Sequence, residues 1–73
     1  EALRCKTCGS DDGGELCDWG LSVTCSRIQP MCVRALFTRR GSSIRSCATL
    51  EMCEGFKRKQ DVDYNCCSND NCN

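Results

Sequence analysis

Ten cysteines in a chain of 73 residues constrain this fold more than any other feature. A domain this short buries a small share of its surface, so its apolar core alone gives marginal stability. The core is also thin, because aromatic residues make up 5% of the chain. An even number of cysteines at this density is typical of a disulfide scaffold, in which each bridge stabilises the fold by about 2–4 kcal/mol. The sequence therefore predicts a single domain over residues 1–73 with five disulfides. The ten cysteines are Cys5, Cys8, Cys17, Cys25, Cys32, Cys47, Cys53, Cys66, Cys67 and Cys72.

Metal binding is the alternative use of these cysteines. Cys5 and Cys8 have the C-x-x-C spacing of half a zinc site, but no second C-x-x-C follows and the chain has no histidine. We therefore prefer disulfides and expect neither a metal nor a cofactor. Because disulfides persist in oxidising compartments, we expect an extracellular protein, either secreted or anchored to the outer face of the plasma membrane. No apolar run approaches the roughly 20 residues that span a bilayer, so an anchor would be a lipid attached outside this chain.

Alternating apolar and polar residues predict short β-strands separated by turns. Residues 10–14 form a dense turn signal, and the alternation over 19–25 indicates a strand with one buried face. Residues 32–38 and 44–48 flank a polar turn at 39–43 that contains a glycine. This arrangement predicts a second β-hairpin.

The segment after the second hairpin gives mixed signals. Residues 49–60 contain good helix formers, but Gly55 interrupts them and no capping box is present. We therefore predict a short helical turn, followed by a strand that ends at residues 64–66.

Cysteine signatures stand at both ends of the chain. The first is Leu3-Arg4-Cys5-Lys6-Thr7-Cys8, and the more specific one is Cys66-Cys67-Ser68-Asn69-Asp70-Asn71-Cys72-Asn73. Together with the order of the ten cysteines, they resemble the urokinase-receptor and lymphocyte-antigen domain family. The resemblance implies a small disulfide-rich all-β domain with a three-finger fold, in which three β-hairpin loops project from a palm of five disulfides.

The resemblance also implies a disulfide pairing, which spacing alone leaves open among roughly 945 possibilities. The implied pairs are Cys5 with Cys32, Cys8 with Cys17, Cys25 with Cys47, Cys53 with Cys66, and Cys67 with Cys72. It further implies that Asn73 hydrogen-bonds back into the palm. Residues 10–14 and 39–43 become the tips of the first two fingers, and 54–65 becomes the third.

Charge is unevenly distributed although the net charge is zero. The segment between Cys8 and Cys25 has acidic but no basic residues, and the segment between Cys25 and Cys47 has five arginines and no acid. Solubilising charge, or attraction between neighbouring fingers, is one interpretation. The other is that the second finger binds a partner protein with an acidic patch, because arginine is enriched at binding hot spots. The predicted partner-binding residues are Arg34, Phe37, Arg39, Arg40 and Arg45.

These features favour a binding module over an enzyme. Histidine, the commonest general base, is missing, and cysteines in disulfides supply no thiolate. A neutral chain also lacks the basic excess that nucleic acids require. We therefore predict a non-enzymatic extracellular protein-binding module, acting as a cell-surface receptor, an adhesion protein or a secreted ligand.

The family resemblance adds two alternative functions. Arg40-Gly41 in the second finger is similar to a pair in snake neurotoxins, which would make the chain a modulator of nicotinic acetylcholine receptors. The five-residue gap between Cys47 and Cys53 is similar to that of protectin, a complement regulator. Protectin carries a functional Trp at the position of Ala48, and this chain departs from it there.

Overall fold

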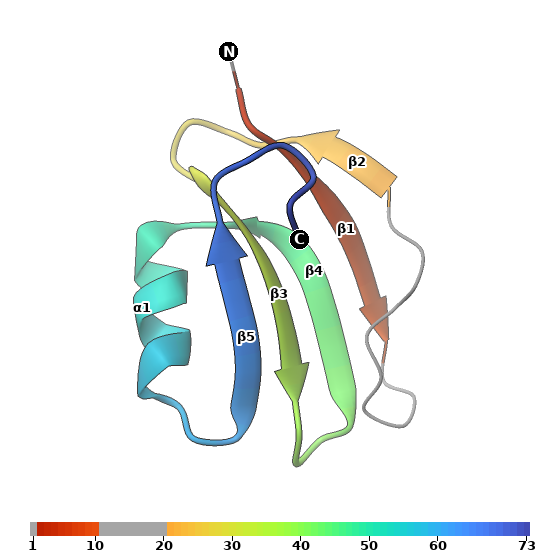
Figure 1. The fold of residues 1–73 in the computed structure, drawn as a ribbon, viewed down its shortest axis with the longest axis vertical. Coiled ribbons are helices and arrows are strands. Elements are labelled where there is room, and N and C mark those ends of the chain that lie inside the picture. Colours follow the sequence, from red (N-terminus) through yellow and green to blue (C-terminus); the bar gives the residue numbers. More distant parts are fainter. Residues whose placement is uncertain (1, 11–20) are drawn as a thin grey trace.

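Five strands and one helix make up the computed structural model, which describes residues 2–10 and 21–73 (Figure 1). In chain order they are β1 (Arg4–Ser10), β2 (Leu21–Thr24), β3 (Met31–Phe37), β4 (Ser42–Ala48), α1 (Leu50–Arg58) and β5 (Val62–Cys67). The strands form a single sheet in the order β2-β1-β4-β3-β5, and every pair of neighbours is antiparallel. The predicted small disulfide-rich all-β class is confirmed.

Strand β3 lies between β4 and β5, and its side chains alternate between the two faces of the sheet. Val33 and Ala35 point to one face and are fully buried, because Phe56 of α1 packs against them there. Arg34 points to the other face and is exposed. The helix therefore supplies an apolar layer on one side of β3.

A second cluster consists of cystines at the end of the sheet where β3 begins. Cys5, Cys25 and Cys32 are buried in it. Four of the five implied disulfides join described residues: Cys5–Cys32, Cys25–Cys47, Cys53–Cys66 and Cys67–Cys72. Cys8 is also disulfide-bonded, but its implied partner Cys17 lies outside the described residues.

Asn73 is held against this cystine end, as the resemblance implies. The Lys6 amide donates to Oδ1 of Asn73 at 3.0 Å. The Asn73 amide Nδ2 donates to the carbonyl oxygens of Lys6 (2.9 Å) and Val33 (2.8 Å). One buried side chain thereby connects the last residue of the chain to β1 and β3.

The predicted second hairpin is present as β3 and β4, with Phe37 opposite Ser42. The turn between them covers residues 38–41, where Gly41 takes a φ of 66° and its amide donates to the carbonyl oxygen of Phe37. Glycine adopts this conformation without steric cost. Of the first hairpin, β2 falls within the predicted strand, whereas the predicted tip beyond Ser10 lies outside the described residues.

The segment after β4 differs from the prediction. The helix α1 runs for nine residues rather than one short turn, and Thr49 caps it by accepting a hydrogen bond from the Met52 amide. Residues 54–65, which the resemblance implies form a third β-hairpin finger, instead include the end of α1 and the start of β5, and β5 pairs with β3. Within the described ranges, no helix is long and apolar enough to cross a membrane.

Candidate functional site

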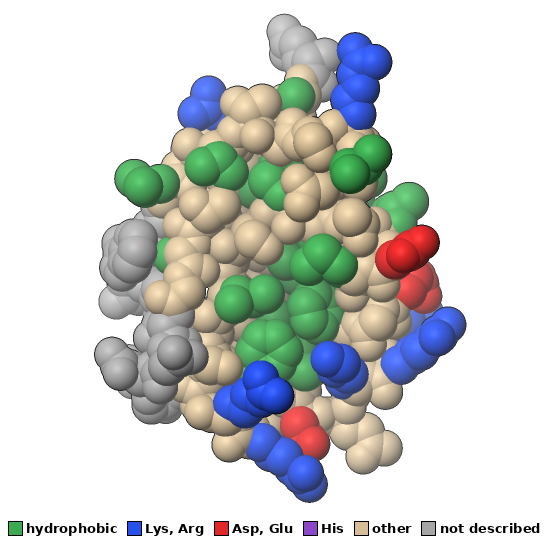
Figure 2. Space-filling model, turned by 180° about the vertical axis from the view of Figure 1, so that it is seen from behind, with side chains coloured by type: hydrophobic (Ala, Val, Ile, Leu, Met, Phe, Trp, Pro, Cys, Tyr) green, Lys and Arg blue, Asp and Glu red, His purple; other side chains and the backbone are tan. Residues whose placement is uncertain are grey.

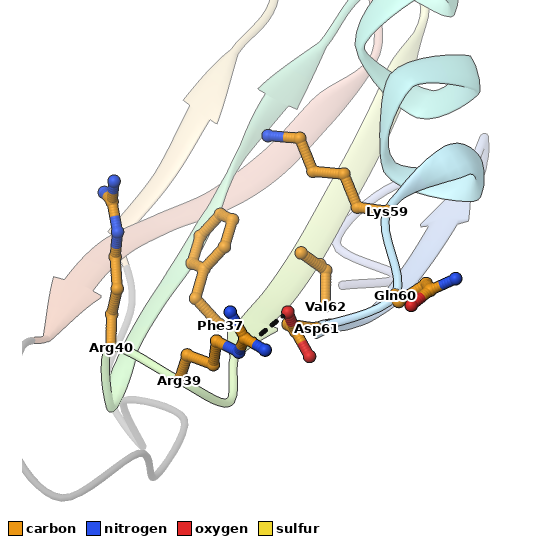
Figure 3. Close-up of a pocket in the computed structure, with 7 residues that line it drawn as sticks. All are labelled: Phe37, Arg39, Arg40, Lys59, Gln60, Asp61 and Val62. Atoms are coloured by element: carbon orange, nitrogen blue, oxygen red, sulfur yellow. Dashed lines mark ion pairs between the residues drawn. The ribbon is translucent and has the colours of Figure 1, made fainter.

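The far end of the sheet from the cystines holds a hollow of about 450 Å³. It forms because the β3–β4 turn and the loop between α1 and β5 meet there, with Phe37 paired opposite Val62. We call this site the hairpin hollow (Figure 3). Its lining residues are Phe37, Arg39, Arg40, Lys59, Gln60, Asp61 and Val62.

Hydrogen bonds to Asp61 hold the two walls of the hairpin hollow together. The backbone amide and the hydroxyl of Thr38 both donate to the Asp61 carbonyl oxygen, at 3.0 and 3.1 Å. The Arg39 Nε also lies 3.0 Å from the Asp61 carboxylate. This ion pair is largely exposed and contributes about 0–1 kcal/mol to stability. It joins the β3–β4 turn to the loop between α1 and β5.

The floor of the hollow is apolar. Phe37 and Val62 are half-buried and lie on the face of the sheet that α1 partly covers. The rings of Phe37 and Phe56 are 6.1 Å apart, so the helix supports the floor from one side. Figure 2 shows a continuous apolar area in the middle of the molecule with Lys and Arg side chains below it. An exposed apolar centre with a charged rim is the usual anatomy of a protein interface.

The cations around this floor are not equivalent. Arg39 is paired with Asp61, whereas Arg40 and Lys59 are exposed and form no ion pair with the residues that the structure describes. Arg40 and Lys59 lie on opposite sides of Phe37 (Figure 3). Three cations and one carboxylate leave the hollow with a net charge of +2. It is therefore suited to an anionic group with an apolar side chain beside it.

The five predicted partner-binding residues do not share one surface. Phe37, Arg39 and Arg40 come together at the hairpin hollow. Arg34 and Arg45 are cross-strand partners on the opposite face of the sheet, because Arg34 is an odd number of positions from Phe37.

Arg34 and Arg45 place two like charges directly opposite each other, an arrangement that is unfavourable on its own. In the part of the chain that the structure describes, the buried Nε of Arg45 has no hydrogen-bond partner. These two residues form a second basic position, separate from the hairpin hollow.

The sequence prediction missed Lys59 and Val62. Lys59 belongs to a basic run, Lys57-Arg58-Lys59. Nearby acidic residues cancel the charge of this run, so the local net charge gives no reason to single out Lys59. Only the pairing of β5 with β3 shows that this loop meets the second hairpin. A local charge count carries no such information.

Sulfur atoms also gather at the cystine end. The Sγ atoms of Cys5, Cys25 and Cys47 all lie within 4.8 Å of one another. Each belongs to a disulfide, so none offers the thiolate that a metal ion requires.

Comparison with known proteins adds no relative from which a role could be transferred. No protein-family model matches the chain, and neither a curated protein nor a solved structure does.

Proposed function

We propose that this chain is a non-enzymatic extracellular protein-binding module, and that its hairpin hollow binds an acidic surface of a partner protein. One observation carries the proposal: an apolar floor lies between two exposed cations, Arg40 and Lys59, that have no ion-pair partner among the described residues. The walls are held by hydrogen bonds within the chain, so little backbone freedom is lost on binding.

The disulfides support the extracellular part of the proposal, since such bonds persist in oxidising compartments. We further propose membership of the urokinase-receptor and lymphocyte-antigen domain family, with a three-finger architecture. The four described pairings and the Asn73 hydrogen bonds agree with what that resemblance implies. Under the same proposal, the protein is either secreted or attached to the cell surface through a lipid anchor.

The chemistry of the side chains supports binding rather than catalysis. The chain has no histidine to act as a general base near neutral pH. The nine described cysteines are all bonded in disulfides. The charged groups of the hairpin hollow are exposed to water, where their interactions are weak and screened.

A neurotoxin-like role is the second candidate. Arg40 is exposed in the β3–β4 turn, immediately before Gly41. That placement is what a receptor modulator acting through an Arg-Gly pair would need. Competition with a labelled antagonist on nicotinic receptors tests this candidate directly.

Charge reversal tests the proposed site. The Arg40→Glu/Lys59→Glu variant is expected to retain far fewer cell-surface proteins than the wild type when both are used as folded affinity baits. The matched control is Arg27→Glu/Arg34→Glu, which changes the net charge equally at exposed positions outside the hollow. Thermal unfolding of both variants checks that folding is intact.

Equal retention by the Arg40→Glu/Lys59→Glu variant and the wild type would contradict the proposal. Loss of binding in the control alone would move the site to the opposite face, where Arg34 lies.

A further inference from the structure

Asp61 already shows how a carboxylate binds in the hairpin hollow. Its carboxylate lies 3.0 Å from the Arg39 Nε, and the pair sits beside Phe37 and Val62 (Figure 3). Arg39 is therefore partly satisfied from within the chain. An incoming acidic group would have to compete with Asp61 for it.

Arg40 and Lys59 remain for a partner. They stand on opposite sides of Phe37, one from the β3–β4 turn and the other from the end of α1 (Figure 3). A ligand with a single carboxylate would engage only one of them. Two carboxylates with an apolar side chain between them would engage both cations and cover the apolar floor.

We propose that the hairpin hollow recognises a short peptide segment of a partner protein in which an apolar side chain is flanked by two acidic residues. This inference rests on the proposed function. The apolar side chain packs on Phe37 and Val62, and the two carboxylates bind Arg40 and Lys59. Arg39 is a positioning residue, and Asp61 is an internal competitor that weakens binding.

The structure favours a peptide over a polyanion or a membrane. The hollow has a net charge of +2 and contains a carboxylate of its own, so it does not form the extended basic surface that a sulfated polysaccharide binds. Its apolar floor would also remain unused by such a ligand. The volume of about 450 Å³ matches a few side chains rather than a lipid surface.

The test uses an array of 12-residue synthetic peptides. Each carries a central Leu, Phe or Trp with one Glu on either side, at separations of one to four residues. Matched peptides replace one Glu by Gln, both Glu by Gln, or the apolar residue by Ser. Binding of the folded wild-type chain is expected to need all three groups, with about two- to fivefold loss for each Glu removed, since exposed ion pairs contribute about 0.2–1 kcal/mol.

Four variants separate the roles of the charged residues. Arg40→Gln and Lys59→Gln are each expected to weaken peptide binding about two- to fivefold, and Arg39→Gln less than about twofold. Asp61→Asn is expected to strengthen binding several-fold, because it frees Arg39. This substitution keeps the backbone carbonyl that accepts both Thr38 hydrogen bonds, so the walls of the hollow stay in place.

Several results would overturn the inference. Equal losses for Arg39→Gln and Arg40→Gln, or weaker binding by Asp61→Asn, would refute the role given to Asp61. Absence of peptide binding, together with cell-surface capture that still depends on Arg40 and Lys59, would refute the acidic-apolar ligand and leave the proposed function standing. Cell-surface capture that is unchanged by substitution of Arg40 and Lys59 would refute both this inference and the proposed function. Sedimentation with phosphatidylserine vesicles at physiological salt, lost in Arg40→Gln, would replace the peptide by a membrane.

Discussion

Replacing Asn73 tests how the end of the chain stabilises the sheet. Its side chain makes three hydrogen bonds to backbone groups of β1 and β3, and it is only 6% exposed. Two variants separate hydrogen bonding from shape. Asn73→Ala removes all three bonds. Asn73→Asp has the same shape and keeps an acceptor for the Lys6 amide, but it cannot donate when ionised.

The expected cost follows from the three hydrogen bonds that are lost. The carbonyl of Val33 belongs to a fully buried residue that water does not reach, so losing its bond to Asn73 costs about 1–1.5 kcal/mol. Lys6 is half-buried, so water can partly replace its two bonds, at about 0.5–1 kcal/mol each. The sum for Asn73→Ala is about 3 kcal/mol. In a domain of this size that corresponds to a fall of roughly 12–24 °C in Tm.

Asn73→Asp is expected to cost at least as much at neutral pH. Its carboxylate would face the carbonyl oxygens of Lys6 and Val33, which carry partial negative charge. Guanidinium unfolding followed by far-ultraviolet circular dichroism, with the disulfides intact, measures both variants against the wild type. If Asn73→Asp unfolds at the same guanidinium concentration as the wild type, the reasoning is refuted, because side-chain shape and not hydrogen bonding would then account for the stabilising effect of Asn73.

Three further predictions concern α1. Gly55→Ala is expected to stabilise the fold by about 0.5–1 kcal/mol in the same unfolding assay, because a Cβ there meets no atom within 4 Å and alanine favours the helix; a loss of stability would contradict this. Thr49→Ala is expected to cost about 1 kcal/mol, since the cap on the Met52 amide is lost, while Thr49→Ser should recover most of it. Replacing Cys53 and Cys66 together by Ser is expected to cost about 3 kcal/mol, as for a loop of this length, and to reduce the helical dichroism signal; unchanged helicity would show that α1 does not need the bridge.

The β3–β4 hairpin could be predicted because its signals are local. Alternation with a period of two marked β3 and β4, and a glycine in the polar turn marked the reversal. Gly41 indeed takes the positive φ that such a turn requires. The first hairpin was partly predictable for the same reason, since β2 lies inside the predicted strand.

The length of α1 could not be predicted locally. Gly55 argued against a continuous helix, and the sequence has no Glu or Gln three residues after Thr49 to complete a capping box. The helix is stabilised by Phe56, which packs on Val33 and Ala35 of a distant strand. Tertiary packing of this kind routinely overrides helix propensity.

Only some residues of the hairpin hollow could be predicted, because its two walls come from segments that are distant in the sequence. Arg39 and Arg40 were identified because they stand in a predicted turn. Lys59 joins them only because β5 pairs with β3 in the register that sets Val62 opposite Phe37. Register between segments distant in sequence depends on packing, which neither charge counting nor alternation reports.

The two ends of β3 explain how a small domain can keep an apolar surface open. At one end, Cys32 is bonded to Cys5 within the buried cystine cluster. At the other, five residues and roughly 17 Å further along the strand, Phe37 is only half-buried. Because disulfides stabilise the first end covalently, the fold does not depend on complete burial at the second. Arg40 and Lys59 make no ion pair with described residues, so their substitution should change binding while leaving the unfolding transition in place. That separation is what allows the charge variants to report on the partner rather than on the fold.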